Sequence, residues 1–258
     1  MNLTDGVILK FQKGGSILFE DICAIKSHTL GEIVDLGYDT FKQYLNVLLM
    51  EKPVITEENE VSKIIDELST FQYFIMTTQM DSNINQMARD AFLFFTGENT
   101  VFSLEPSYII FGDITDNRRM DEDAFYEFRR VLKRLCFIEL EGEEIIIYKD
   151  DSPQIKNLKR QMIKNRERVA KAKSRGQKAD GSGIELSDLV ASITFGGCNL
   201  NMSNVWDITY YSFRDQLKRM GWHEKFDINN RAALAGAKLK KSQLKHWIKG
   251  ISNDDKDD

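Results

Sequence analysis

Charge divides the chain into an acidic part followed by a basic part. Residues 1–153 carry 14 Lys and Arg against 28 Asp and Glu, whereas residues 154–250 carry 20 against 8. The last eight residues have a net charge of −3, which completes the overall net charge of −5. Because the sign changes at one place, we predict two modules that meet near residue 153.

The predicted division follows this composition. An acidic, helix-rich α+β module occupies residues 1–153, and a basic helix followed by a Gly/Ser/Lys-rich linker occupies residues 154–183. A basic all-α module follows over residues 184–251, and residues 252–258 form an acidic tail that we expect to be disordered.

Hydrophobic content of 42% and 16 Phe indicate a folded protein. The longest apolar runs, such as residues 145–148, are too short to span a bilayer, and the N-terminus lacks the pattern of a signal peptide. We therefore expect a cytosolic protein without a membrane role. Cys23, Cys136 and Cys198 form no CxxC pair, which predicts reduced thiols and no thiolate zinc site.

Helical signals dominate the first module. Thr29-Leu-Gly-Glu32 has the form of a capping box, and the apolar spacing that follows is interrupted near Gly37. Further helices are predicted after Thr56 as far as Phe71, after Asp81, and after Asp121.

Two β-hairpins are predicted between and after these helices, over residues 101–111 and 137–148. The second module shows only helical signals, over residues 185–195, 204–220, 229–237 and 241–249. The predicted fold class is therefore mainly α, of α+β type, with two small hairpins in the first module.

Catalytic motifs are absent from the sequence. It contains no GxxxxGK[ST], GxGxxG, HExxH or GxSxG pattern, and His28, His223 and His246 stand far apart. We therefore predict a protein that is not an enzyme and has no cofactor, catalytic residue or bound metal.

The segment 154–178 holds ten basic residues and one acid. It could bind nucleic acid through phosphates, although it has no aromatic residue to stack on bases. It could instead bind an acidic protein or the acidic module of a second copy, or form a solvated connecting helix. The candidate contact residues are Lys156, Lys159, Arg160, Lys164, Arg166, Arg168, Lys171, Lys173 and Arg175.

An aromatic stripe marks the second module. Trp206, Tyr210 and Phe213 lie at helical spacing, followed in phase by Leu217 and Met220. The stripe forms either the core of the module or a face that binds a partner protein, because a module this small has a thin core of its own.

A series of short packing and capping stretches runs through both modules. These are Thr29–Ile33, Gly37–Tyr38, Tyr44–Leu45, Ala91–Phe95, Asp121–Phe125, Arg129–Leu132, Val205–Tyr210, Asp215–Gln216 and His246–Trp247. In this order, with the basic segment between them, they resemble the tail assembly chaperones of long-tailed bacteriophages, particularly of phages that infect Gram-positive hosts.

The resemblance implies a non-enzymatic role in the host cytoplasm. Such chaperones bind the tape measure protein, recruit tail-tube subunits and self-associate through an N-terminal helical domain, while a C-terminal extension engages the tube protein. Trp206, Tyr210, Phe213 and Trp247 are the candidate partner-binding residues. The alternative is a phage nucleic-acid-binding accessory protein, in which residues 125–148 form a winged-helix-like element and the basic segment contacts nucleic acid.

Overall fold

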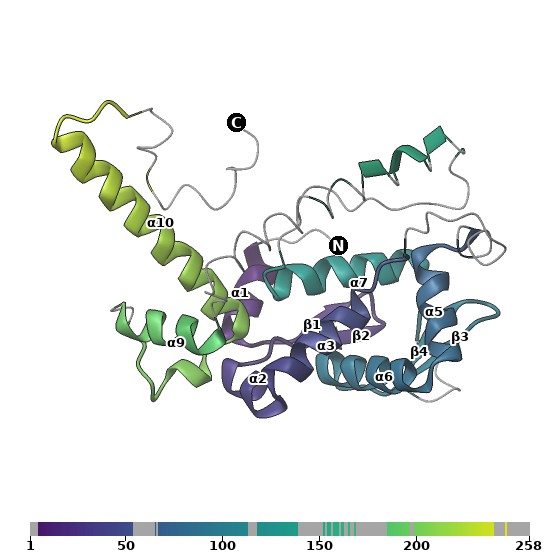
Figure 1. Ribbon diagram of the computed structural model, residues 1–258. Coiled ribbons are helices and arrows are strands. Elements are labelled where there is room, and N and C mark those ends of the chain that lie inside the picture. The colour runs from purple at the N-terminus through teal and green to yellow at the C-terminus, as the bar shows by residue number, and fades with distance from the viewer. Residues whose placement is uncertain are drawn as a thin grey trace.

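The structure is a computed structural model that describes residues 5–53, 65, 67–112, 118–138, 152, 154, 155, 157–159, 161, 162, 165, 168, 185–196, 199–239 and 246. The fold is mainly helical with two small antiparallel sheets, which confirms the predicted class (Figure 1). The helices are α1 (Asp5–Lys13), α2 (Leu30–Leu36), α3 (Tyr38–Leu48), α5 (Thr70–Met80), α6 (Ser82–Thr96), α7 (Glu122–Leu135), α9 (Leu186–Phe195), the 3₁₀ helix η1 (Val205–Asp207) and α10 (Tyr210–Leu234).

The two sheets are built from neighbouring segments of the chain. β1 (Ile17–Phe19) pairs with β2 (Cys23–Ile25), and β3 (Thr100–Ser103) pairs with β4 (Tyr108–Phe111), which also pairs with β5 (Arg119–Met120). The β3–β4 hairpin confirms the prediction for residues 101–111. The predicted hairpin at 137–148 lies outside the described residues beyond Ile138.

Capping chemistry sets the start of α2 as the sequence predicts. The Thr29 hydroxyl accepts a hydrogen bond from the Glu32 amide at 3.2 Å, and the Glu32 carboxylate accepts one from the Thr29 amide at 2.8 Å. Gly37, with φ of 95°, ends α2 and starts α3. The interruption read from the sequence is therefore a break between two helices.

Replacing Thr29 by alanine removes this cap. We expect the free energy of unfolding to fall by about 1 kcal/mol, the usual cost of losing a Thr side chain at a helix start. Urea denaturation followed by circular dichroism measures the loss. Ser82→Ala, at an exposed position in the first turn of α6, is the control and should change stability much less.

Three other helix predictions have different outcomes. Asp81 and Asp121 cap α6 and α7, as expected. The helix predicted from Thr56 to Phe71 lies largely outside the described residues, and Phe71 belongs to α5, which begins after a separate capping box at Ser69. That box uses Gln72 in place of a glutamate.

The helices predicted at 204–220 and 229–237 are wrong as separate elements. One helix, α10, runs over 25 residues from Tyr210 to Leu234, and Trp206 lies before it in η1. Thr209 is the N-cap of α10, because its hydroxyl accepts a hydrogen bond from the Ser212 amide at 3.0 Å. The helix predicted at 241–249 lies outside the described residues.

One cluster of buried side chains extends from α1 to α10. Near its middle, the Phe92 ring lies 5.6 Å from the Phe111 ring and 5.4 Å from the Phe128 ring. Farther along, the Phe41 ring of α3 lies 5.3 Å from the Tyr210 ring of α10. The first turn of α10 thus shares a core with the N-terminal helices, while the division of the chain into modules stays a prediction.

Candidate partner-binding surface

Two helix starts that are far apart in sequence lie side by side where α10 meets the N-terminal helices. Thr29 precedes α2, Thr209 precedes α10, and the two residues form an antiparallel β-bridge. The Leu30 amide donates to the Ile208 carbonyl at 2.8 Å. This bridge holds the first turn of α10 against α2, because it pairs backbone groups that helix starts leave free.

Polar side chains reinforce the same junction. The Ser212 hydroxyl donates to the Gln12 carbonyl at 3.1 Å, and the Gln12 amide donates to the Asp215 carboxylate at 3.4 Å. Asp215 is buried and also accepts a 2.7 Å bond from Arg219. The burial of Asp215 is therefore compensated by a charged partner on the same helix.

The junction buries two of the four predicted partner-binding residues. Phe213 is fully buried and Tyr210 nearly so. Burial raises the pKa of the Tyr210 hydroxyl, and a hydrogen bond with Tyr38 raises it further by a smaller amount. In this conformation both side chains belong to the shared core. Trp247 lies outside the described residues.

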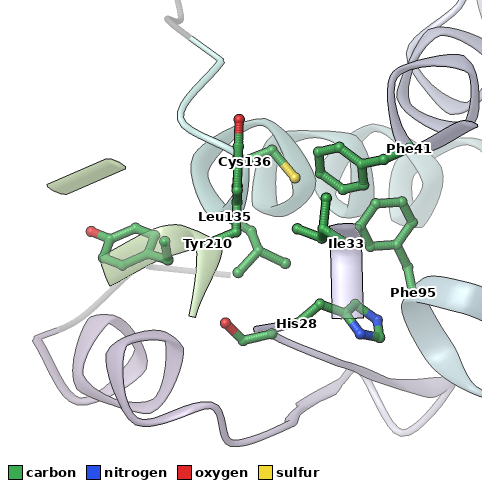
Figure 2. Close-up of a pocket in the computed structure, with 9 residues that line it drawn as sticks. His28, Ile33, Phe41, Phe95, Leu135, Cys136 and Tyr210 are labelled. Carbon is green, nitrogen blue, oxygen red and sulfur yellow. The ribbon is translucent and has the colours of Figure 1, made fainter. Parts of the chain in front are cut away.

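A narrow cavity opens at the junction, with space for about one water molecule. Figure 2 shows the surrounding side chains, which come from the segment before α2 and from α2, α3, α6, α7 and α10. The lining is mainly apolar and includes the buried thiol of Cys136, whose pKa is raised by burial. The cavity is too small for a cofactor-sized ligand.

His28, which lines this cavity, also faces Glu32. The His28 Nδ1 atom lies 3.3 Å from a Glu32 carboxylate oxygen, and the His28 ring stacks on Phe94 at 3.8 Å. Partial burial alone would raise the pKa of Glu32, but hydrogen bonds from Thr29 and the interaction with His28 hold it below its ordinary value. The pair therefore supports the α2 cap.

The third predicted residue, Trp206, lies on an exposed part of the molecule. Its Nε1 atom donates to the Met202 carbonyl at 2.8 Å, and its side chain is half-buried. Met202 is 60% exposed, and its sulfur lies 3.8 Å from the hydroxyl of Thr194. Phe195, which follows Thr194 in the chain, is 94% exposed at the end of α9. We use the name apolar patch for Phe195, Met202 and Trp206, because Met202 contacts Trp206 through its carbonyl and Thr194, the neighbour of Phe195 in the chain, through its sulfur.

Sequence reasoning missed Phe195 and Met202. The buried face of α9 carries Val190 and Ile193 at helical spacing, and Phe195 falls two positions after Ile193, outside that phase. An aromatic residue out of phase at the end of a helix, just before Gly196, was the available signal.

The distal part of α10 projects away from the other labelled elements (Figure 1). The helix ends at Leu234, and Gly236 follows its C-cap with φ of 91°, where the Ala237 amide donates to the Ala232 carbonyl at 2.9 Å. The His246 ring lies 5.1 Å from the Phe226 ring. His246 therefore packs against α10.

The basic segment is described only in part. Ile155, Leu158 and Met162 are 45%, 58% and 44% exposed, so their apolar stripe faces solvent. Arg168 is exposed and Lys159 half-buried. The remaining candidate contact residues lie outside the described part of the chain: Lys156, Arg160, Lys164, Arg166, Lys171, Lys173 and Arg175.

Side chains that could hold a metal ion do not converge in the described part of the chain. There, no three His, Cys, Asp or Glu side chains lie close enough together to hold a metal ion. Cys23 is buried, which raises its thiol pKa to about 12, and Cys198 lies outside the described residues. Among the described helices, none has the length and apolar character needed to cross a membrane.

Comparison with known proteins gives one match. Residues 173–252 match a family described as the YomV second domain, which is associated with bacteriophages. The match indicates a phage protein and does not specify tail assembly. No curated protein and no solved structure matches the chain significantly. The matched range contains the apolar patch and all of α10.

Proposed function

We propose that the chain is a non-enzymatic tail assembly chaperone of a phage, which binds tape measure protein and recruits tail-tube subunits in the host cytoplasm. The observation that carries this proposal is the apolar patch at Phe195, Met202 and Trp206, which lies within the range matched by the phage-associated family. The resemblance of the whole chain to tail assembly chaperones supplies the two partners.

The patch suits protein binding for a physical reason. A Phe side chain that is 94% exposed gains roughly 2 kcal/mol when a partner removes it from water. Met202, whose sulfur contacts the neighbouring Thr194, has a flexible side chain that adapts to an irregular surface. A half-buried Trp206, held by its own hydrogen bond, adds a rigid aromatic of the kind enriched among residues that dominate binding energy.

The test is binding by purified wild-type protein to tape measure protein and, separately, to tail-tube protein from the same phage. We expect the double variant Phe195→Ala/Met202→Ala to weaken binding to at least one of them by about 30-fold or more, because it truncates the two exposed side chains of the patch. Circular dichroism should show an unchanged fold, since both residues are exposed.

Met80→Ala is the matched control, because Met80 is 79% exposed on α5, outside the patch. It should bind like the wild type. A wild-type protein that binds neither partner, or a double variant that binds both normally, would contradict the proposal. Copurification of nucleic acid, detected by absorbance ratio and lost on reversing Lys159 and Arg168, would favour the nucleic-acid alternative.

A further inference from the structure

Hydrogen bonds within residues 199–204 hold the turn that carries Met202. The Asn201 Oδ1 atom accepts from the Ser203 amide at 2.8 Å and from the Asn204 amide at 3.2 Å. In return, the Asn204 Oδ1 atom accepts from the Asn201 amide at 2.8 Å. Because Trp206 also donates to the Met202 carbonyl, this part of the apolar patch is formed before a partner arrives, which lowers the cost of binding.

Acidic side chains lie next to the patch. Asp188 precedes Phe195 by seven residues, so the two share one face of α9, and both are exposed. Asp207 follows Trp206 directly in η1 and is exposed as well. Both segments that carry the patch therefore also carry a carboxylate beside it.

Helix α2 brings a third carboxylate to the same surface. A Cβ atom on Gly31 would lie 3.4 Å from the Cβ atom of Trp206, so α2 contacts Trp206 at this glycine. Asp35 comes four residues after Gly31 on the same side of α2, and it is exposed. The contact thus places Asp35 one helical turn from the point where Trp206 meets α2.

The sequence of these segments offers no base to offset the carboxylates. Residues 185–213 hold three acids and none of the twenty Lys and Arg found between residues 154 and 250. Residues 30–36 hold two acids and likewise no Lys or Arg. The patch therefore lies in an acidic interval of the otherwise basic second part of the chain.

Two bases of α10 lie close in sequence to the contact with α9, but neither offsets this charge. Met220 faces Gly196 at the end of α9, where an added Cβ atom would lie 2.7 Å from the Met220 sulfur. Lys218 comes two residues earlier, which places it nearly on the opposite side of the helix. Arg219 is already paired with Asp215 at 2.7 Å.

Exposure and charge together indicate what this surface binds. Protein interfaces commonly have an apolar centre and a polar rim. Here Phe195, which is 94% exposed, supplies an apolar centre, and the carboxylates supply the rim. Carboxylates attract Lys and Arg and repel phosphates, so they favour a basic protein segment over nucleic acid.

We propose that the apolar patch binds a basic amphipathic segment of its partner protein. An apolar side chain of that segment packs on Phe195 and Met202, while Lys or Arg residues beside it reach Asp35, Asp188 and Asp207. The proposal rests on the proposed function and deepens it, because it assigns the chemistry of the segment that the same patch recognises. The apolar contact supplies affinity, and the carboxylates select among partners.

The first test presents two synthetic peptides to the purified full chain. Both carry leucine at every third or fourth position of a short amphipathic helix, and the other positions are rich in lysine in one peptide and in glutamate in the other. Fluorescence anisotropy at about 0.1 M salt should show that the lysine peptide binds about tenfold more tightly or better. The preference should shrink at about 1 M salt, where the Debye length falls from about 10 Å to about 3 Å.

Two variants locate the binding. Phe195→Ala/Met202→Ala should weaken binding of the lysine peptide by about tenfold or more, because it removes the apolar contact. Asp35→Lys/Asp207→Lys should weaken it by a similar factor and strengthen binding of the glutamate peptide, because it reverses the charge at two exposed positions. Asp188 is left unchanged, since its carboxylate accepts a backbone hydrogen bond at the start of α9.

Glu67→Lys/Glu105→Lys is the matched control. It makes the same change in charge at two exposed residues. Glu105 lies in the β3–β4 hairpin, at the other end of the labelled elements from α9 (Figure 1). This variant should bind both peptides like the wild type, and circular dichroism checks that all variants fold.

Three results would overturn the proposal. They are equal binding of the two peptides, no binding of either, and a lysine peptide that binds Asp35→Lys/Asp207→Lys as tightly as the wild type. Tighter binding by Lys159→Glu/Arg168→Glu would identify the basic segment of the chain itself as the occupant and overturn the assignment to a partner.

Failure of the proposed function has a different readout. It fails when the double alanine variant of the patch binds tape measure and tail-tube protein normally, whatever the peptides do. If that variant loses tail-protein binding while the wild type binds the two peptides equally, the proposed function stands and the inference about a basic segment is overturned alone.

Discussion

Replacing Phe213 by alanine is expected to lower the free energy of unfolding by about 3–5 kcal/mol, the range for truncating a large aromatic in a packed core. Phe213 is fully buried and belongs to the cluster that includes the N-terminal helices. If that shared core is one cooperative unit, urea denaturation should show a single transition, shifted as a whole to lower urea.

Phe195→Ala is the control, because it makes the same chemical change at a residue that is 94% exposed. It should alter stability by less than about 0.5 kcal/mol. A Phe213→Ala protein whose N-terminal helices unfold at the wild-type urea concentration would show that α10 contributes little to that core. The comparison therefore tests whether residues 1–153 and the start of α10 fold together.

Local chemistry made parts of this fold predictable. The capping box at Thr29, the caps at Asp81 and Asp121, and the β-prone runs around Pro106 each act over a few residues, and each appears where expected. The N-terminal helix α1 and the β1–β2 hairpin were not predicted. The two strands of this hairpin are three residues long and therefore too short to show an alternating pattern.

Long-range contacts were not predictable in the same way. Trp206, Tyr210 and Phe213 have the spacing of one helix face, which fits a local core, a docking face and a shared core equally well. The bridge between Thr29 and Thr209 places the start of α10 against α2, so that Tyr210 and Phe213 lie in the shared core in this conformation. No periodicity in either segment indicates a pairing across such a sequence separation.

The continuity of α10 was missed for a different reason. Gly221 and a polar run around Asp227 and Asn229 lie between or at the start of the two helices predicted at 204–220 and 229–237. In the structure the helix continues through them, with an ion pair from Asp227 to Arg231 one turn later. A single glycine costs about 1 kcal/mol in a helix, which weakens the helix without ending it.

Replacing Arg129 by alanine is the other change for which we expect a large loss of stability. The Arg129 side chain is fully buried in α7, and its Nη2 atom donates to the Leu49 carbonyl at 2.9 Å and to a Glu51 carboxylate oxygen at 2.5 Å. Its guanidinium also lies over the Phe125 ring at 5.6 Å. These contacts tie α7 to the segment that follows α3.

We expect Arg129→Ala to lower the free energy of unfolding by about 3 kcal/mol. The substitution leaves a cavity and removes charge-assisted hydrogen bonds. The loss should stay at the lower end for a buried pair, because Glu51 is 56% exposed and regains water when its partner is removed. Arg129→Met, which keeps most of the volume, should lose less, and the difference between the two variants measures the packing contribution.

Arg130→Ala tests whether burial is the cause. Arg130 is the next residue on α7 and pairs with Glu127 at 2.9 Å, but its side chain is 44% exposed. Solvent screens such a pair, so its loss should cost less than about 1 kcal/mol. Chemical denaturation of the three variants beside the wild type gives the comparison. Equal losses for Arg129→Ala and Arg130→Ala would mean that the buried guanidinium does not hold α7 against the segment after α3.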